Sequence, residues 1–201
     1  MEQRSPEWYS ARLGRVTASA VCNVLAKLKT GKEAQARADY RMQLVAERLT
    51  GLPADKYQTP AMAWGVENEA DARFLYEEQT GNLVTEVGFI DHPTVDFSGA
   101  SPDGLVGNDG LLEIKCPSTK THIETLLAKE CPEKHLPQIQ WQLACTGRQW
   151  CDFVSFDPRM PEGLEMFVCT VARDDQYISM LEAEITAFLA EIQQIIEKLG
   201  V

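Results

Sequence analysis

Apolar and polar residues along this chain follow two periods, and these distinguish predicted helices from predicted strands. Apolar residues recur every three or four positions in long stretches, which places them on one face of a helix. Shorter apolar and β-branched runs lie between Gly or Pro residues, as strands do. The predicted helices are Thr17–Leu28, Ala36–Thr50, Met62–Thr80, Ser118–Lys129, Pro137–Thr146 and Asp174–Leu199; the predicted strands are Val84–Asp91, Val95–Ser101, Leu111–Cys116, Trp150–Phe156 and Glu165–Val171.

The helical stripes predict which side chains are buried. The expected buried residues are Tyr40, Leu44, Val45 and Leu49 in the second helix, Trp64, Val66, Ala70 and Phe74 in the third, and Ile178, Leu181, Ile185, Phe188, Ile192, Ile195 and Leu199 in the last. This order of helices and strands predicts an α/β fold, with a central mixed sheet flanked by helices. At 201 residues, we expect a single domain spanning residues 1–201.

The composition is that of a globular protein, with 44% hydrophobic and 24% charged residues. No apolar run approaches the roughly 18 residues that a membrane-spanning helix needs, and the first residues do not resemble a signal peptide. Six cysteines without a Cys-x-x-Cys pair indicate buried free thiols. We therefore expect a cytoplasmic protein that does not associate with membranes.

The stretch from Ser101 to Pro117 carries the candidate chemistry. Alternate side chains of a strand share a face, so Glu113 and Lys115 point one way and Ile114 points into the core. Asp103 lies in a Pro-Asp-Gly turn upstream. If Val95–Ser101 and Leu111–Cys116 pair as a hairpin, Asp103 returns beside Glu113, and two carboxylates then share a small site with one ammonium group.

Two close carboxylates repel each other, and a divalent cation removes that conflict. Hard oxygen ligands suit Mg²⁺, and Mn²⁺ is expected to substitute for it. Lys115 could then orient or activate a water molecule, which would suit metal-assisted hydrolysis of a phosphodiester. The alternative is an exposed Glu-x-Lys pair that follows an ordinary turn, and these residues alone leave both interpretations open.

Several further residues are candidates for a functional role, although a purely structural role would also explain each of them. Glu69 is a possible third carboxylate, although acidic residues early in a helix also favour its dipole. Arg12 precedes a predicted helix start that would suit an anion, and surface arginines beside an N-cap are the alternative. Gln140 lies in the helix with Gln138 and Gln142, of which one or two could reach a polar site.

The net charge of −11 disfavours a protein that coats DNA along its whole surface. A local basic track remains compatible with that charge. The segment from Lys27 to Lys32 contains Lys27, Lys29 and Lys32 and could follow a phosphate backbone. Solvated surface charge is the commoner explanation for so short a run.

Four blocks of residues resemble those of the PD-(D/E)xK nucleases, and more closely those of the lambda exonuclease (YqaJ) branch. The blocks are Trp8 with Arg12-Leu-Gly and Thr17-Ala-Ser19; Ala63-Trp64-Gly65 with Glu69 and Ala72-Arg73; Ser101-Pro-Asp103-Gly with Leu-Glu113-Ile-Lys115-Cys-Pro; and Gln138-Ile-Gln140 with Asp157-Pro-Arg159-Met160. They occur in the family order over nearly the whole chain. The resemblance implies a restriction-endonuclease-like core.

The resemblance also implies roles for individual residues. Asp103, Glu113 and the Ile114 carbonyl would hold Mg²⁺, and Glu69 would complete the acidic site. Lys115 and Gln140 would position or activate the attacking water. A terminal 5′-phosphate would be bound by Arg12, Ser19 and Ser101. Met62 would be an apolar wedge at the duplex end, and Lys27, Lys29 and Lys32 would lie on the DNA track.

One position departs from the family pattern. A second phosphate-binding arginine is expected a few residues after Cys116-Pro117, where this chain has Thr121. Lys120 is adjacent and would take its place, although a lysine lacks the bidentate fork of arginine.

The family resemblance implies an enzyme that digests one strand of linear double-stranded DNA from the 5′ end and leaves a 3′ overhang. It also implies a ring-shaped homotrimer and a single-strand annealing protein as partner. Two alternatives remain: an endonuclease with the same core, and a non-catalytic protein that binds DNA ends as a recombination scaffold.

Overall fold

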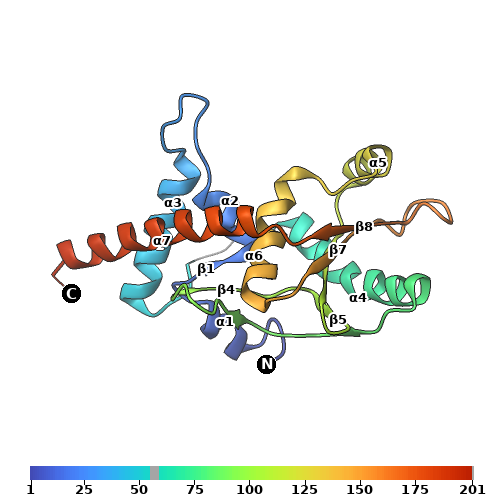
Figure 1. Cartoon of the computed structure of the whole chain (residues 1–201), viewed down its shortest axis with the longest axis horizontal. Coiled ribbons are helices and arrows are strands. Elements are labelled where there is room, and N and C mark those ends of the chain that lie inside the picture. Colours follow the sequence, from blue (N-terminus) through green and yellow to red (C-terminus); the bar gives the residue numbers. More distant parts are fainter. Residues whose placement is uncertain (55–58, 201) are drawn as a thin grey trace.

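The computed structural model describes residues 1–54 and 59–200. Figure 1 shows the arrangement of its helices and strands. The helices are α1 (Pro6–Arg12), α2 (Val21–Val24), α3 (Gln35–Thr50), α4 (Pro60–Thr80), α5 (Thr119–Ala128), α6 (Leu136–Thr146) and α7 (Asp175–Lys198), with 3₁₀ turns at Ala18–Ala20 and Glu133–His135. The strands are β1 (Val16–Thr17), β2 (Val84–Thr85), β3 (Ile90–Asp91), β4 (Ser98–Ala100), β5 (Gly104–Val106), β6 (Gly110–Lys115), β7 (Trp150–Phe156) and β8 (Met166–Ala172).

Five strands form the sheet that carries Glu113, in the order β2-β5-β6-β7-β8. Strands β6 and β7 are parallel, whereas the other neighbours are antiparallel. The chain crosses from β6 to β7 through α5 and α6, as a parallel connection requires. The predicted mixed sheet with flanking helices is therefore confirmed.

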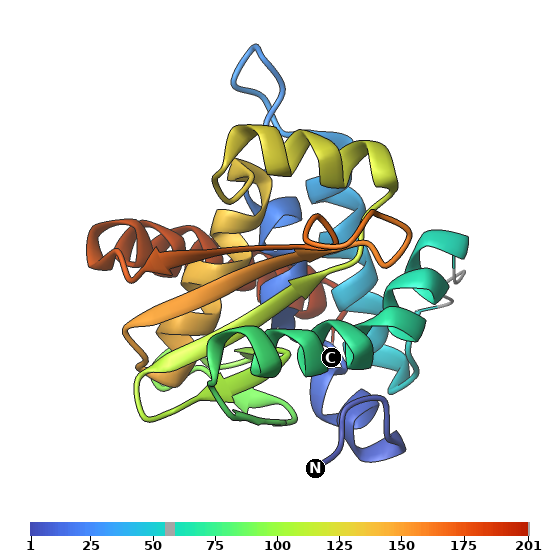
Figure 2. The same ribbon diagram turned by 90° about the vertical axis from the view of Figure 1, so that its right-hand side faces the viewer.

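Helices cover both faces of this sheet, and β6 contributes side chains to both. Leu111 packs in the larger hydrophobic cluster with residues of α2, α3, α6 and α7. Leu112 and Ile114 pack on the opposite face, against Ala72 and Tyr76 of α4. Figure 2 shows α4 in front of the strands and α6 behind them. This alternation determines the face on which Glu113 and Lys115 lie. A shift of β6 by one residue in the sheet would turn both side chains to the face that Leu112 and Ile114 now occupy.

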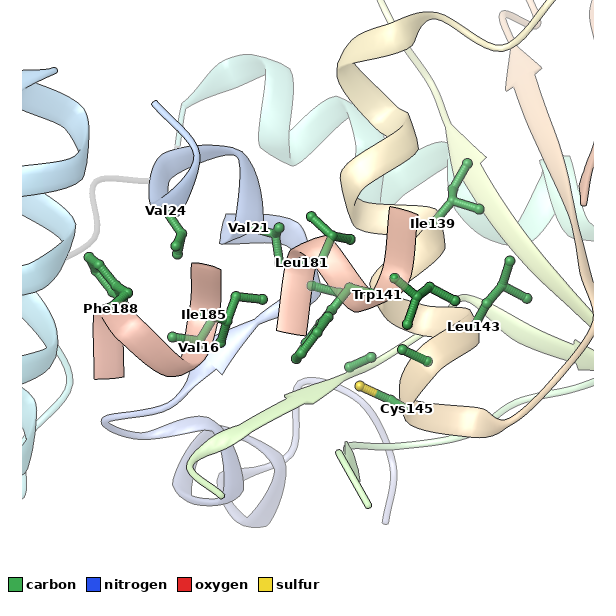
Figure 3. Packing of buried hydrophobic residues seen from close by; sticks show 14 of the residues in the cluster. Val16, Val21, Val24, Ile139, Trp141, Leu143, Cys145, Leu181, Ile185 and Phe188 are labelled. Atoms are coloured by element: carbon green, nitrogen blue, oxygen red, sulfur yellow. The ribbon is translucent and has the colours of Figure 1, made fainter. Parts of the chain in front are cut away.

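The larger cluster joins the C-terminal helix to the rest of the chain. Figure 3 shows Leu181, Ile185 and Phe188 of α7 near Trp141 of α6 and Val16 of β1. All five side chains are buried. The apolar stripe of α7 is thus buried as predicted through Ile192, whereas Leu199 is 61% exposed beyond the end of the helix.

A smaller sheet has the strand order β1-β4-β3. The predicted strand Val84–Asp91 is divided between the two sheets, because β2 pairs with β5 and β3 pairs with β4. The predicted strand Val95–Ser101 is shortened to β4 and lies in the smaller sheet. It therefore does not pair with β6, and that predicted hairpin is wrong.

Several predicted helix limits and buried faces also differ. Helix α1 was not predicted; Ser5 caps it by accepting a hydrogen bond from the Trp8 amide. The helix predicted to reach Leu28 is a 3₁₀ turn followed by the short α2. Leu49 is 44% exposed, so the predicted buried stripe of α3 ends one turn earlier.

Helix α4 buries a different face from the predicted one. Asn68, Ala72 and Tyr76 are buried at successive i, i+4 positions, whereas Phe74 is 65% exposed. Val66 and Ala70 are exposed as well. The Tyr76 hydroxyl donates a 2.7 Å hydrogen bond to Asp152 of β7. This contact orients the side of α4 that carries Ala72 and Tyr76 toward the sheet. The predicted stripe failed because the apolar residues of α4 surround the helix rather than lining one side.

One loop stands out from the surface of the molecule. The loop between α2 and α3 projects from the body of the molecule (Figure 1, Figure 2). In the ranges that the structure describes, no helix is long and apolar enough to cross a membrane.

Candidate active site

Strand β6 places Glu113 and Lys115 together on the face that α6 covers. Glu113 is only 1% exposed, and its Oε1 contacts Nζ of Lys115. The Lys115 side chain is 30% exposed, so it reaches from the buried carboxylate toward the surface. Ile114 faces the other way, into the core. These three orientations confirm the alternation predicted for this strand.

The Pro-Asp-Gly turn brings Asp103 beside the same strand. The hairpin partner of β6 is β5, in which Gly104 pairs with Leu112. The Asp103 amide donates to the Leu112 carbonyl at 3.1 Å, and the Ile114 amide donates to Oδ2 of Asp103 at 2.7 Å. Asp103 therefore lies next to Glu113, as predicted, although a different strand forms the hairpin.

Close packing explains the glycine of this turn. A Cβ atom at Gly104 would lie 2.1 Å from Cγ1 of Val84 on β2. Any larger residue would push β5 away from β2 and move the turn that holds Asp103. Glycine at position 104 thus permits the sheet and the acidic site to form together.

The electrostatics of the site favour a bound cation. Burial raises the pKa of Asp103 well above its ordinary value, and the charge of Glu113 raises it further. Burial would lower the pKa of Lys115, but the charges of Glu113 and Asp103 outweigh that effect and raise it. Lys115 therefore stays protonated, and a further cation would also let Asp103 ionise.

The donor atoms fit a hard divalent cation. Asp103 and Glu113 offer carboxylate oxygens, which suit Mg²⁺ or Mn²⁺. The Ile114 carbonyl faces the same side as its amide, which is bonded to Asp103, because a strand residue directs both groups to one neighbour. Among residues 1–54 and 59–200, no three His, Cys, Asp or Glu side chains form a ready metal cluster. The fit therefore rests on two carboxylates and one backbone carbonyl.

Two glutamines of α6 hold Glu113. Nε2 of Gln138 donates to Oε1 of Glu113, and Nε2 of Gln142 donates to Oε2, both at 2.6 Å. The two residues lie four positions apart, so they share a face of the helix. Their two donors, one on each carboxylate oxygen, fix the orientation of Glu113. The family resemblance did not assign this role to either residue.

The structure places Gln140 elsewhere. Its Nε2 donates to the Ala172 carbonyl at 2.8 Å, and its Oε1 accepts from the Asp174 amide at 2.9 Å. Gln140 thus joins α6 to the segment between β8 and α7. The prediction that Gln140 acts on the attacking water is therefore wrong, because helical geometry turns position 140 away from positions 138 and 142.

Glu69 of α4 lies near the site but is engaged by arginines. Its Oε2 contacts Nη2 of Arg4, and its Oε1 lies 3.9 Å from Nη2 of Arg73. Its charge still contributes to the raised pKa values of Asp103 and Lys115. Glu69 therefore borders the acidic pair, while a direct metal contact stays a prediction.

Arg12, Ser19 and Ser101 gather near one cavity at the end of α1. Arg12 and Ser19 line a cavity of about 200 Å³ that Arg15, Thr17 and other residues also border. Nη1 of Arg12 donates to Oγ of Ser101 at 3.2 Å. Burial lowers the pKa of Arg12, and its guanidinium lies 4.0 Å from the centre of the Trp8 ring. The arrangement offers a fixed cation and hydroxyl groups to an anion.

Lys120 does not join this group. Its side chain is 86% exposed and lies 3.7 Å from Glu124, one turn further along α5. It does not line the cavity that contains Arg12. The prediction that Lys120 replaces the missing second arginine is therefore not supported by its position, because the α5 start directs it to solvent.

The predicted DNA-contacting residues lie on the surface. Met62 is 52% exposed in the first turn of α4. Lys29 and Lys32 are exposed in the projecting loop between α2 and α3, and Nζ of Lys27 lies 3.2 Å from Glu184 of α7. These positions are accessible to a large ligand, and contact with DNA stays a prediction for each of them.

Comparisons with known proteins identify the family of this chain. A family model described as the YqaJ-like viral recombinase domain matches residues 7–149. The alkaline exonuclease LHK-Exo from Laribacter hongkongensis is 49% identical, with a TM-score of 0.91 over 98% of this chain and 96% of that one. LHK-Exo in complex with dAMP gives the same identity and TM-score over 97% and 96%. Curated proteins gave no match.

A more distant structure shares the fold. A phage-related exonuclease from Haemophilus somnus 129PT is 15% identical, with a TM-score of 0.71 over 92% of this chain and 96% of that one. At this identity the likeness concerns the arrangement of helices and strands alone.

Proposed function

Because the chain belongs to the YqaJ-like viral recombinase domain family, we propose that it is a Mg²⁺-dependent exonuclease that degrades one strand of linear double-stranded DNA from the 5′ end. The observation that carries this proposal is the Ile114 hydrogen bond to Asp103, because it holds this half-buried carboxylate beside the buried carboxylate of Glu113. The 49% identity to an alkaline exonuclease supports the reaction class.

Asp103, Glu113 and the Ile114 carbonyl would hold the cation. When bound, Mg²⁺ supplies charge stabilisation at phosphate oxygens and lowers the pKa of coordinated water. Gln138 and Gln142 keep the Glu113 carboxylate oriented toward the site. Lys115, anchored by its contact with Glu113, would hold the attacking water by donating a hydrogen bond from Nζ. The site thus positions a nucleophile beside a charged phosphate.

The cavity beside Arg12 supports a preference for 5′ ends. A terminal phosphate would accept hydrogen bonds from Arg12, Ser19 and Ser101, while the following phosphodiester reaches Asp103 and Glu113. Ser101, which accepts a hydrogen bond from Arg12, lies two residues before Asp103, so this contact connects Arg12 to the segment that carries the acidic site. Attack at phosphorus breaks its bond to the O3′ of the terminal nucleotide. Each cut then leaves a new 5′-phosphate for the same cavity.

The product of this cleavage is a 5′-mononucleotide. LHK-Exo was crystallised with dAMP, which is a nucleotide of that kind. The family resemblance further supports a 3′ single-stranded overhang as the second product, and a single-strand annealing protein as the partner that uses it. It also supports a ring-shaped homotrimer, which would keep basic residues around the DNA and leave the acidic ones of a chain with net charge −11 outside.

An endonuclease built on the same site is the second candidate. A linear duplex with one 5′-phosphorylated end and a covalently closed circle, each incubated with Mg²⁺ and with EDTA, distinguish the two. We expect Mg²⁺-dependent loss of the 5′-phosphorylated strand and an intact circle. Cleavage of the circle would assign an endonuclease, and stable substrates in both reactions would favour a non-catalytic DNA-end-binding scaffold.

A further inference from the structure

Arg4 lies outside the residues that the family model matches, yet its side chain reaches the candidate active site. Its Nη2 contacts Oε2 of Glu69 on α4, across 65 positions of sequence. The Arg4 side chain is 42% exposed, whereas that of Glu69 is 17% exposed. The guanidinium is therefore anchored at one end and open to solvent at the other.

The backbone before α1 holds Arg4 in an uncommon conformation. Arg4 has a φ of 67°, in the left-handed region that non-glycine residues seldom occupy. Nε2 of Gln3 donates to the Pro102 carbonyl at 2.8 Å and to the Val87 carbonyl at 2.9 Å. Pro102 directly precedes Asp103. Gln3 thus fastens this segment to the turn that carries Asp103.

Gly88 provides a second point of close contact. A Cβ atom at Gly88 would lie 2.5 Å from the Met1 carbonyl oxygen, so the segment before α1 packs directly on the connection between β2 and β3. Any side chain at position 88 would displace this segment. Strain at Arg4 persists because contacts on both sides of it fix the backbone.

The surrounding charges show what this guanidinium can bind. Lys115 is engaged by Glu113, and Arg73, whose Nη2 lies 3.9 Å from Glu69, is engaged by Glu86. A DNA phosphate that approaches Asp103 and Glu113 meets repulsion from both carboxylates. An arginine with one part of its planar fork on Glu69 retains N–H groups for a phosphate oxygen.

We propose that Arg4 is a substrate-binding residue of this site, held in place by Gln3 and Glu69 and directed at a DNA phosphate next to the reacting bond. This inference rests on the proposed function and adds a contact to it. Glu69 then holds Arg4 in addition to bordering the acidic pair.

Salt-dependent DNA binding in EDTA tests this role without cleavage. The binding constant for a fluorescent, 5′-phosphorylated duplex is measured by anisotropy between 50 and 200 mM NaCl. Each phosphate contact contributes about 0.9 to the slope of log K against log salt concentration. We expect Arg4→Gln to reduce that slope by about 0.9 and to weaken binding about fivefold at the lower salt concentrations.

Two further variants distinguish the effect of the position of Arg4 from the effect of losing one positive charge. Lys198→Gln removes one positive charge from the last turn of α7, far along the chain from the site, and should leave the slope unchanged. Gly88→Ala keeps every charge but displaces the segment that carries Arg4, and should reproduce most of the loss. Circular dichroism of all three variants checks that they remain folded.

The outcomes distinguish this inference from the proposed function. If the wild-type protein binds the duplex and Arg4→Gln binds it with the same slope, Arg4 makes no phosphate contact and the inference fails alone. Tighter Mn²⁺ binding by Arg4→Gln, with unchanged DNA binding, would make Arg4 a mere counterion of Glu69 and would also overturn it. A wild-type protein that binds no DNA would instead contradict the proposed function.

Discussion

Nε2 of Gln142 donates a hydrogen bond of 2.6 Å to Oε2 of Glu113, from a side chain that is fully buried. Gln138 completes the arrangement by donating to Oε1. A buried carboxylate that accepts an amide hydrogen bond on each oxygen cannot rotate freely. The chemistry proposed for Asp103 and Glu113 therefore depends on α6 as well as on β6.

Replacing Gln142 by Met removes the donor while retaining most of the volume. We expect kcat to fall about 10- to 100-fold, as is typical when a group that orients a metal ligand is lost. Gln140→Met is the matched control, because its bonds go to Ala172 and Asp174. It should lower stability by about 1–3 kcal/mol while leaving the rate per folded molecule within about twofold. Equal losses of rate in both variants would contradict the assignment.

Metal binding should stabilise the protein more at high pH than at low pH. Burial and Glu113 raise the pKa of Asp103 above its ordinary value of 3.8. In EDTA the folded state therefore holds that proton more tightly than the unfolded state, and stability falls as the pH rises from about 4 through the raised pKa. Mg²⁺ favours the ionised form, so the Tm increase that it causes should grow with pH.

Differential scanning calorimetry at pH 5 and pH 8, with Mg²⁺ and with EDTA, measures this difference. For a chain of this size, about 1 kcal/mol of binding free energy raises Tm by about 2–4 °C. Asp103→Asn should abolish most of the Mg²⁺ effect at both pH values. A Tm that Mg²⁺ leaves unchanged at pH 8 would contradict a cation site at these residues.

Arg12 should determine the preference for phosphorylated ends. It lines the cavity of about 200 Å³ and donates to Ser101. We expect Arg12→Ala to reduce the rate on 5′-phosphorylated duplex about tenfold, through loss of about 1.4 kcal/mol of charge-assisted binding. The rate on 5′-hydroxyl duplex should change little. The measurement is the ratio of the two initial rates.

Lys120→Ala provides the control for that ratio. Because Lys120 is exposed and faces Glu124, its removal should leave the ratio unchanged. A ratio that falls in Lys120→Ala but not in Arg12→Ala would place the phosphate pocket at the start of α5 instead.

The buried contact between Tyr76 and Asp152 should contribute to stability without affecting the chemistry. Asp152 also accepts from Thr170, and the Tyr76 hydroxyl also accepts from Asn82. Tyr76→Phe removes one hydrogen bond at Asp152 and should lower the free energy of unfolding by about 1–3 kcal/mol in urea denaturation. Tyr9→Phe, at a side chain that is 55% exposed, should change it by less than about 0.5 kcal/mol. Equal effects would show that the Asp152 contact does not stabilise α4 against the sheet.

Sequence patterns were informative where they repeat over several residues. The last three residues of β6, Glu113, Ile114 and Lys115, alternate between polar and apolar, so their orientations were predictable. The i, i+4 spacing of Gln138 and Gln142 also indicated a shared face, and it could have separated both from Gln140. In that case the helix geometry was a better guide than the family motif.

Other features could not be predicted because their signal is short or nonlocal. Strand β5 has only three residues, too few for a pattern, so the sequence favours the longer segment Val95–Ser101 as the partner of β6. Arg4 and Glu69 meet only because the folded chain brings positions 65 residues apart into contact. The buried face of α4 depends on the Asp152 partner of Tyr76, which the helix sequence alone does not indicate.

The most direct test of the account is the initial rate of mononucleotide release from a 5′-phosphorylated linear duplex at saturating Mg²⁺. It compares the wild-type protein with Lys115→Ala and Asp103→Asn, with DNA binding measured in parallel. We predict at least about a 10³-fold loss of rate in both variants, with DNA binding by Lys115→Ala largely retained. Rates within a few-fold of wild type for either variant would contradict catalysis at this site.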